Sequence, residues 1–164
     1  MPALTLLNVR ILQNGSEAVL YFSYMPEMKS ILVVEDDPIL KNLLGHTLTG
    51  KYQTLYASDG NEALALFEAN KPVLILLDLM LPTMGGFDVL EALRKREDEG
   101  RTVPVIVVSN LGQDGDKEKA KALGATDYLV KAEVAVEEII AKMESVLASV
   151  SPTAAPIPEA APIA

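Results

Sequence analysis

Cysteine is absent from the 164-residue chain, which excludes disulfides and thiolate metal sites and fits a reducing cytoplasm. No apolar run approaches the roughly 20 residues that a membrane-spanning helix needs. The opening segment lacks a basic start, and Asn8 and Arg10 interrupt its apolar stretch, so we expect no secretory signal. These absences predict a cytoplasmic protein that does not enter the membrane.

Basic residues are outnumbered by acidic ones, and the formal net charge is −9 at pH 7. Such a surface repels nucleic-acid phosphates and anionic lipid, so we expect no direct nucleic-acid binding. An acidic surface instead permits cation binding or contact with a basic partner, although solvated helix faces account for such an excess more often. Apolar residues make up 49% of the chain, which is enough for one globular domain.

Composition divides the chain into three zones. Residues 151–164, SPTAAPIPEAAPIA, are rich in proline and alanine and are predicted to be a disordered tail. In residues 1–27, apolar runs flank Asn14-Gly15, which indicates a hairpin; a non-native or upstream extension is the favoured alternative. Residues 28–150 form the predicted domain. We expect no output domain after Val150, so that the protein acts through a partner.

Short apolar runs alternate with helical patterns through residues 28–150. The runs are Ser30–Val34, Tyr52–Ala57, Val73–Leu77, Val103–Val108 and Thr126–Val130. Their Ile, Leu and Val content predicts strands that are covered on both faces. Helical patterns begin near Pro38, Asn61, Gly86, Asp114 and Val134. Asn61 is the expected N-cap of its helix, and Gly124 lies where a helix should end.

This alternation predicts a doubly wound α/β fold, in which a five-stranded parallel sheet has helices on both faces. Ligands of such sheets bind beyond the carboxyl ends of the strands. The functional site is therefore expected at that edge.

Polar side chains follow four of the five predicted strands. Glu35-Asp36-Asp37 follow the first strand, Asp78 the third, Ser109 the fourth and Lys131 the fifth. Clustered carboxylates repel one another and need a cation, and hard oxygen ligands suit Mg²⁺. A lysine and a hydroxyl beside the metal would donate to a phosphoryl group. Each residue alone is more often a solvated loop residue or cap, but together they predict Asp78 as a nucleophile that forms an aspartyl phosphate.

The segments ILVVEDDP, LILLDLMLPTMGGFDVL, PVIVVSN and DYLVK resemble the receiver domain of bacterial two-component response regulators, in its stand-alone chemotaxis-regulator type. The resemblance covers residues 28 to about 150 and implies a flavodoxin-like strand order of 2-1-3-4-5. It implies that Asp78 is the phosphoacceptor and that Mg²⁺ is the cofactor. Asp36 would bind the metal directly, Glu35 would support it, and the backbone carbonyl of Met80 would be the remaining ligand.

The same resemblance assigns the switch and the partners. Ser109 and Lys131 would bind the phosphoryl group, and Tyr128 would turn inward when Ser109 moves. A sensor histidine kinase would be the phosphoryl donor, and the domain would catalyse its own phosphorylation and dephosphorylation. The output would be read by a protein partner at the face formed by the fourth helix, the fifth strand and the fifth helix.

One departure from the family lies beside the site. Ala132 follows Lys131, where many members have a proline after a cis peptide bond. A cis bond before alanine would cost about 2.5–4 kcal/mol. The loop after the fifth strand is therefore expected to differ from the family pattern.

Two other functions remain open at this point. A phosphohydrolase of the haloacid dehalogenase type also uses a strand-end aspartate, but it needs a second aspartate two positions later, where this chain has Met80. A pseudo-receiver that binds partners without phosphorylation would not need the full set of acidic, Ser and Lys residues. His46, the only histidine, is predicted to be an ordinary surface residue.

Overall fold

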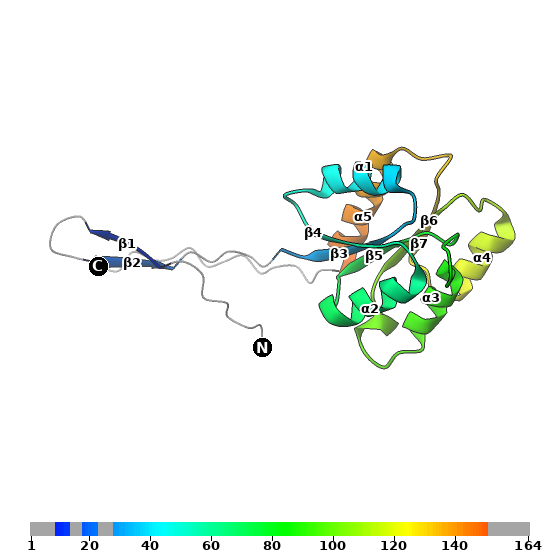
Figure 1. Cartoon of the computed structure of the whole chain (residues 1–164), viewed down its shortest axis with the longest axis horizontal. Helices are drawn as coiled ribbons and strands as arrows, with labels where there is room; N and C mark the ends of the chain where they lie inside the picture. The colour runs from blue at the N-terminus through cyan, green and yellow to red at the C-terminus, as the bar shows by residue number, and fades with distance from the viewer. Residues whose placement is uncertain (1–8, 14–17, 23–27, 151–164) are drawn as a thin grey trace.

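A five-stranded parallel sheet lies at the centre of the domain in this computed structural model, which describes residues 9–13, 18–22 and 28–150 (Figure 1). The strand order is β4-β3-β5-β6-β7. Numbered along the domain this is 2-1-3-4-5, which confirms the predicted fold. The strands are β3 (Ser30–Val34), β4 (Gln53–Ala57), β5 (Leu74–Leu77), β6 (Val105–Ser109) and β7 (Asp127–Val130).

Helices cover both faces of this sheet, as expected (Figure 1). They are α1 (Pro38–Leu48), α2 (Gly60–Asn70), α3 (Gly86–Arg94), α4 (Asp114–Ala122) and α5 (Val136–Val150), with a 3-10 turn, η1 (Glu99–Arg101). Helices α1 and α5 pack on one face, and α2 and α3 pack on the other. Alternate residues of a strand point to opposite faces, so Ile31 and Val33 of β3 contact the first layer, and Leu32 and Val34 the second.

The prediction that all five strands are buried on both faces holds only for the three central ones. All four residues of β5 and all five of β6 are buried, whereas β4 and β7, at the two edges, are partly exposed. An edge strand has a neighbour on one side only, so its side chains are covered less completely. The polar residues at the carboxyl ends of the central strands, Glu35, Asp78 and Ser109, are themselves buried.

Helix ends correct one prediction from the sequence. The N-cap of α2 is Asp59 and not Asn61, because the Asp59 carboxylate accepts hydrogen bonds from the backbone N–H groups of Asn61 (2.8 Å) and Glu62 (3.0 Å). A carboxylate also suits the positive end of the helix dipole. Gly124 follows α4 with a φ of 91°, a left-handed conformation that glycine adopts at little cost.

Outside the domain, the backbone of β1 (Val9–Gln13) pairs in antiparallel fashion with that of β2 (Ala18–Phe22). Asn14-Gly15 and the tail at 151–164 lie outside the described residues, so the predictions for them stay predictions. Among the helices that the structure describes, none is long and apolar enough to cross a membrane. Residues 28–150 contain no cis peptide bond, and the Lys131–Ala132 bond is trans.

Candidate functional site

Three carboxylates meet where β3 and β5 end. Each of Glu35, Asp36 and Asp78 offers one oxygen, and these oxygens lie within 4.8 Å of one another. The two strands are paired in the register Val34↔Leu77, so the residues that follow them are neighbours. Glu35 and Asp78 are only 3% and 4% exposed, whereas Asp36 is exposed to solvent. The cluster therefore has a buried floor and one solvent-facing carboxylate.

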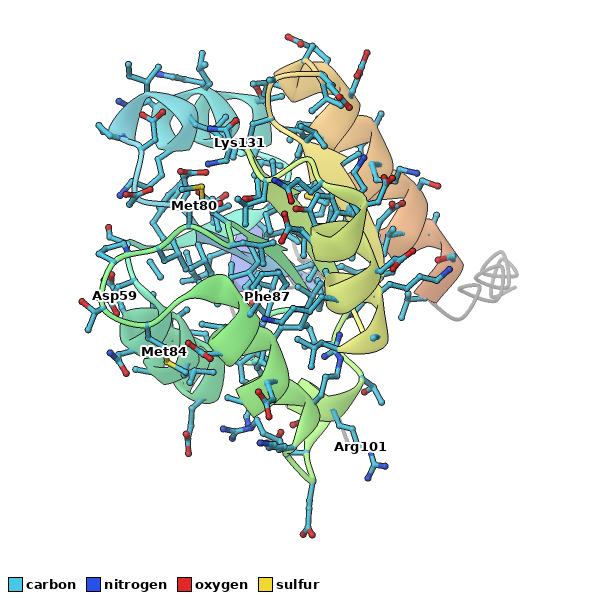
Figure 2. All side chains as sticks on the ribbon, turned by 90° about the vertical axis from the view of Figure 1, so that its right-hand side faces the viewer. Asp59, Met80, Met84, Phe87, Arg101 and Lys131 are labelled. Atoms are coloured by element: carbon cyan, nitrogen blue, oxygen red, sulfur yellow. The ribbon has the colours of Figure 1, made fainter. Side chains whose placement is uncertain are left out.

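Lys131 brings a positive charge to these carboxylates from the end of β7. Its Nζ lies 2.6 Å from Oδ2 of Asp78 and 2.7 Å from Oε2 of Glu35. The Lys131 backbone N–H donates to the carbonyl oxygen of Ser109 (3.0 Å), which anchors the residue to β6. In Figure 2, Lys131 reaches the edge of the sheet that also carries the Met80 loop. A lysine is thus fixed within hydrogen-bond distance of the predicted nucleophile.

Burial and hydrogen bonding shift the pKa values of Glu35 and Lys131 in opposite directions. Burial raises the pKa of Glu35 above its usual value, although the hydrogen bonds from Lys131 and from the Asp37 backbone lower it in part. Burial alone would lower the pKa of Lys131, but hydrogen bonds to Asp78 and Glu35 outweigh it, and the pKa is raised. Lys131 is therefore held in its charged form at neutral pH, as a phosphoryl-binding ammonium must be.

Backbone N–H groups orient the buried carboxylates. The N–H of Met80 donates to Oδ1 of Asp78 (3.0 Å), and the N–H of Asp37 donates to Oε1 of Glu35 (3.1 Å). Asp37 itself caps α1, since its carboxylate accepts from the N–H of Ile39 (2.8 Å). The third acidic residue of the motif thus serves the helix, and the other two form the cluster with Asp78.

The donor set fits a small hard cation. Three carboxylates supply the oxygen ligands that Mg²⁺ prefers, and the solvent-facing side of Asp36 leaves room for the waters that Mg²⁺ retains. A dication would also offset the repulsion among the carboxylates. The backbone carbonyl of Met80 remains a predicted ligand, because only its N–H has a defined contact here.

Ser109 and Tyr128 are joined through the loop that follows β6. The Ser109 side chain is fully buried, and its Oγ accepts a weak bond from the N–H of Leu111 (3.4 Å). The hydroxyl of Tyr128 donates to the carbonyl oxygen of the same Leu111 (2.6 Å). Burial, followed by the negative charges of Asp116 and Asp78, raises the pKa of Tyr128. Ser109 and Tyr128, both predicted switch residues, are therefore linked through Leu111, and this link was not predicted from the sequence. Leu111 acts through backbone atoms, which leave no side-chain signal.

Close backbone approach is a second feature that the sequence did not reveal. Gly86 begins α3 with its Cα pressed against the loop after β5, and an added Cβ would meet the carbonyl oxygen of Asp78 and lie 2.7 Å from Cα of Leu79. Its N–H donates to the carbonyl oxygen of Leu79 (3.1 Å). The sequence had predicted only that a helix begins near Gly86.

Comparison with known proteins gives one consistent result. The family model described as "Response regulator receiver domain" matches residues 31–144. The chain is 37% identical over 120 residues to a probable transcriptional regulator, ycf27, of Cyanophora paradoxa, covering 73% of this chain and 48% of that protein. It is 40% identical over 121 residues to the sensory transduction protein RegX3 of Mycolicibacterium smegmatis, covering 73% and 51%. The chain thus spans about half the length of these curated relatives.

A solved structure agrees with the sequence comparisons. The chemotaxis protein CheY4 of Vibrio cholerae superimposes with a TM-score of 0.67 and 29% identity. The match covers 73% of this chain and 99% of that one. The likeness therefore extends over the whole five-stranded domain.

Proposed function

The chain belongs to the family of response regulator receiver domains, and from that premise we propose that Asp78 is its phosphoacceptor. One observation carries the proposal: the buried carboxylate of Asp78 lies 2.6 Å from the Lys131 ammonium and within a cluster of three carboxylates. A carboxylate so placed has a donor for the phosphoryl oxygens on one side and a cation site on the other.

The donor in this proposal is a phosphohistidine of a sensor kinase. An oxygen of Asp78 attacks the phosphorus, the phosphorus–nitrogen bond breaks, and the imidazole leaves with the bonding electrons. Asp36, Asp78 and the Met80 carbonyl would hold Mg²⁺, with support from Glu35, and the metal would supply neutralisation of the charge that gathers on the phosphoryl oxygens. Lys131 keeps its ammonium directed at Asp78 and orients the group. Water attack in the same site returns the free carboxylate.

The phosphoryl group is read, in this proposal, by Ser109, Lys131 and Tyr128. It brings about −1.5 to −2 units of charge and three acceptor oxygens, to which the Ser109 hydroxyl can donate. Movement of Ser109 would loosen its contact with Leu111 and with it the bond that holds Tyr128. The affected face is that of α4, β7 and α5, where Lys142 pairs with Asp127 (2.8 Å). A protein partner would bind this face when the populations shift.

The two rival functions have less support. A haloacid dehalogenase-type phosphohydrolase would place its acid/base at position 80, and Met80 cannot transfer a proton. A pseudo-receiver would not need a lysine held between two buried carboxylates. Cytoplasmic action without direct contact to nucleic acid remains part of the proposal for this chain.

The test is phosphorylation of the purified chain with acetyl phosphate and Mg²⁺, followed by intact mass measurement. We expect one added phosphoryl group in the wild type that is labile to acid, to alkali and to hydroxylamine, as an acyl phosphate requires. Asp78→Asn, which is nearly isosteric and lacks the nucleophile, should not gain it. Asp37→Asn is the matched control, because Asp37 is adjacent to the cluster but caps α1, and asparagine caps as well. An undiminished acyl phosphate on Asp78→Asn would refute the assignment.

A further inference from the structure

The loop after Asp78 places a thioether at the edge of the site. The side chain of Met80 is large and apolar, yet Met80 is 57% exposed. Its backbone N–H is bonded to Oδ1 of Asp78 (3.0 Å), which fixes the residue beside the acceptor carboxylate. In Figure 2, Met80 and Lys131 lie near each other, and Lys131 contacts the same carboxylate. More than half of the Met80 surface is therefore open to solvent and to small solutes.

Other methionines in residues 28–150 provide internal comparisons. Met143 is fully buried in the layer of α5, and Met84 is half-buried where its side chain and carbonyl face Gly60. Met28 is 48% exposed but precedes β3, at the strand end opposite the site. The chain has no cysteine, so thioethers are its oxidisable sulfur groups. Among the methionines of residues 28–150, Met80 is therefore the one whose oxidation would place a new polar group beside Asp78.

We propose that Met80 is a peroxide-sensitive modification site whose sulfoxide shortens the lifetime of the acyl phosphate on Asp78. The inference rests on the proposed function of Asp78. In the step itself, a sulfur lone pair attacks one oxygen of hydrogen peroxide. The sulfur–oxygen bond forms as the oxygen–oxygen bond breaks, and the departing hydroxide takes up the proton from the oxygen that has joined the sulfur, which leaves a sulfoxide and water. The sulfur is oxidised by two electrons and the peroxide is reduced; a thiol-dependent reductase can reverse the change.

The expected change in the lifetime of the acyl phosphate follows from how the thioether and the sulfoxide interact with water. A thioether is a weak hydrogen-bond acceptor, so Met80 in its reduced form cannot orient a water for attack on phosphorus. A sulfoxide oxygen is strongly polar and can accept a hydrogen bond from such a water. One added hydrogen bond of ordinary strength, present in the transition state, accelerates hydrolysis about fivefold.

The first arm of the experiment maps oxidation in the full chain. The protein is treated with limiting hydrogen peroxide, digested, and the sulfoxide at each methionine is measured by mass spectrometry. Met80 and Met28 should oxidise fastest among the described methionines, Met84 more slowly and Met143 last. Oxidation of Met80 at the rate of the buried Met143 would overturn the inference, because the sulfur would then not be accessible.

The second arm measures loss of phosphate from Asp78 after removal of acetyl phosphate. Peroxide should shorten the lifetime about fivefold in the wild type and in Met28→Leu, and should have no effect on the lifetime in Met80→Leu. Met80→Gln carries an oxygen acceptor at a similar reach and should be short-lived without peroxide. An unchanged lifetime in wild type whose Met80 is oxidised would overturn this inference alone. Failure of the reduced wild type to form an acyl phosphate would overturn the proposed function and the inference together.

Discussion

The Lys131 ammonium lies 2.7 Å from Oε2 of Glu35, almost as close as it lies to Oδ2 of Asp78, the proposed phosphoacceptor. Both of these carboxylates are buried, and the Lys131 side chain is only 14% exposed. One ammonium therefore pairs with two buried carboxylates and offsets only part of their negative charge. Glu35 has both oxygens engaged, one by Lys131 and one by the N–H of Asp37. This favours a positioning role for Glu35 and leaves Asp36 as the acid best placed for direct metal binding.

Removal of the shared cation should destabilise the metal-free protein. In Lys131→Ala, Glu35 and Asp78 remain buried without a counter-ion, and breaking a buried pair in this way costs about 3–5 kcal/mol. Mg²⁺ should restore part of the loss, because it would supply the missing positive charge. The measurement is urea unfolding with and without Mg²⁺. Lys142→Ala, which breaks the exposed pair with Asp127, is the control and should cost at most about 1 kcal/mol. Equal losses in the two variants would show that Lys131 does not neutralise the buried carboxylates.

The fold could be predicted from the sequence because its signals are local and repeated. Continuous runs such as Ser30–Val34 specify buried strands, and strict alternation with helices leaves one sheet architecture. Errors lie where a single residue decides a boundary. Asp59 and Asn61 are both good caps by type, and only the backbone direction shows which side chain meets the N–H groups. The burial of the edge strands β4 and β7 was overestimated, because composition does not show which strands have a neighbour on one side only.

The residues of the site could be predicted because they come directly after the strands of a parallel sheet. Parallel strands bring Glu35, Asp36, Asp78 and Lys131 to one edge of the sheet, and the structure places them together. What the sequence could not show is which groups bond to one another. Glu35 pairs with Lys131, and a backbone carbonyl joins the loop of Ser109 to Tyr128. Such contacts depend on loop geometry, which residue types do not encode.

Asp36→Ala should weaken Mg²⁺ binding while making the metal-free protein slightly more stable. The substitution removes a solvent-facing oxygen of the cluster and also removes one of three mutually repelling carboxylates. We expect the Mg²⁺ affinity to fall about tenfold or more, measured by calorimetric titration. Asp37→Ala should lower stability by about 1 kcal/mol through loss of the α1 cap but leave Mg²⁺ affinity near that of the wild type. A reversed order of the two affinities would show that Asp37 is the ligand.

Gly86→Ala should be strongly destabilising. The added methyl group would enter the space of the Asp78 carbonyl and the Leu79 backbone, and backbone atoms cannot move aside as a flexible side chain can. We expect a loss of about 2–3 kcal/mol and a weaker Mg²⁺ affinity, because the loop that orients Asp78 must shift. Gly115→Ala in α4 is the control, since nothing lies within 4 Å of its added methyl group; it should be neutral or stabilising by up to about 1 kcal/mol. Equal stability of the two variants would exclude the close approach at Gly86.

The acid stability of the domain should depend in part on Asp98. Hydrogen bonds from the Arg96 side chain, the Gly100 backbone and the Lys71 side chain hold the pKa of Asp98 well below its usual value. A lowered pKa in the folded state gives stability that is present above the unfolded pKa of about 3.9. That stability is lost as the pH falls from there towards the folded value. Asp98→Asn does not ionise, so its deficit against the wild type should be largest near neutral pH and shrink below about pH 4. Urea midpoints across this range measure the deficit, and a pH-independent deficit would contradict the assignment.

Tyr128→Phe tests whether the link through Leu111 carries the switch. The phenylalanine keeps the ring among Leu79, Val107 and Ala120 but loses the hydroxyl that donates to the Leu111 carbonyl oxygen (2.6 Å). Loss of this one bond should cost about 1 kcal/mol, and it frees the loop whose N–H contacts Ser109.

If the Leu111 link couples the site to the face of α4, β7 and α5, amide NMR shifts on phosphorylation should become smaller at α4 and β7 in Tyr128→Phe, while those beside Asp78 persist. Without the hydroxyl, the aromatic ring at position 128 is no longer bonded to the Leu111 loop. Part of the variant population therefore already has the released conformation before phosphorylation. Tyr56→Phe, on the edge strand β4, is the matched control and should leave the shifts unchanged. Wild-type shifts on α4 in the Tyr128 variant would mean that the ring position, and not the hydroxyl, transmits the change, and would remove Leu111 from the path.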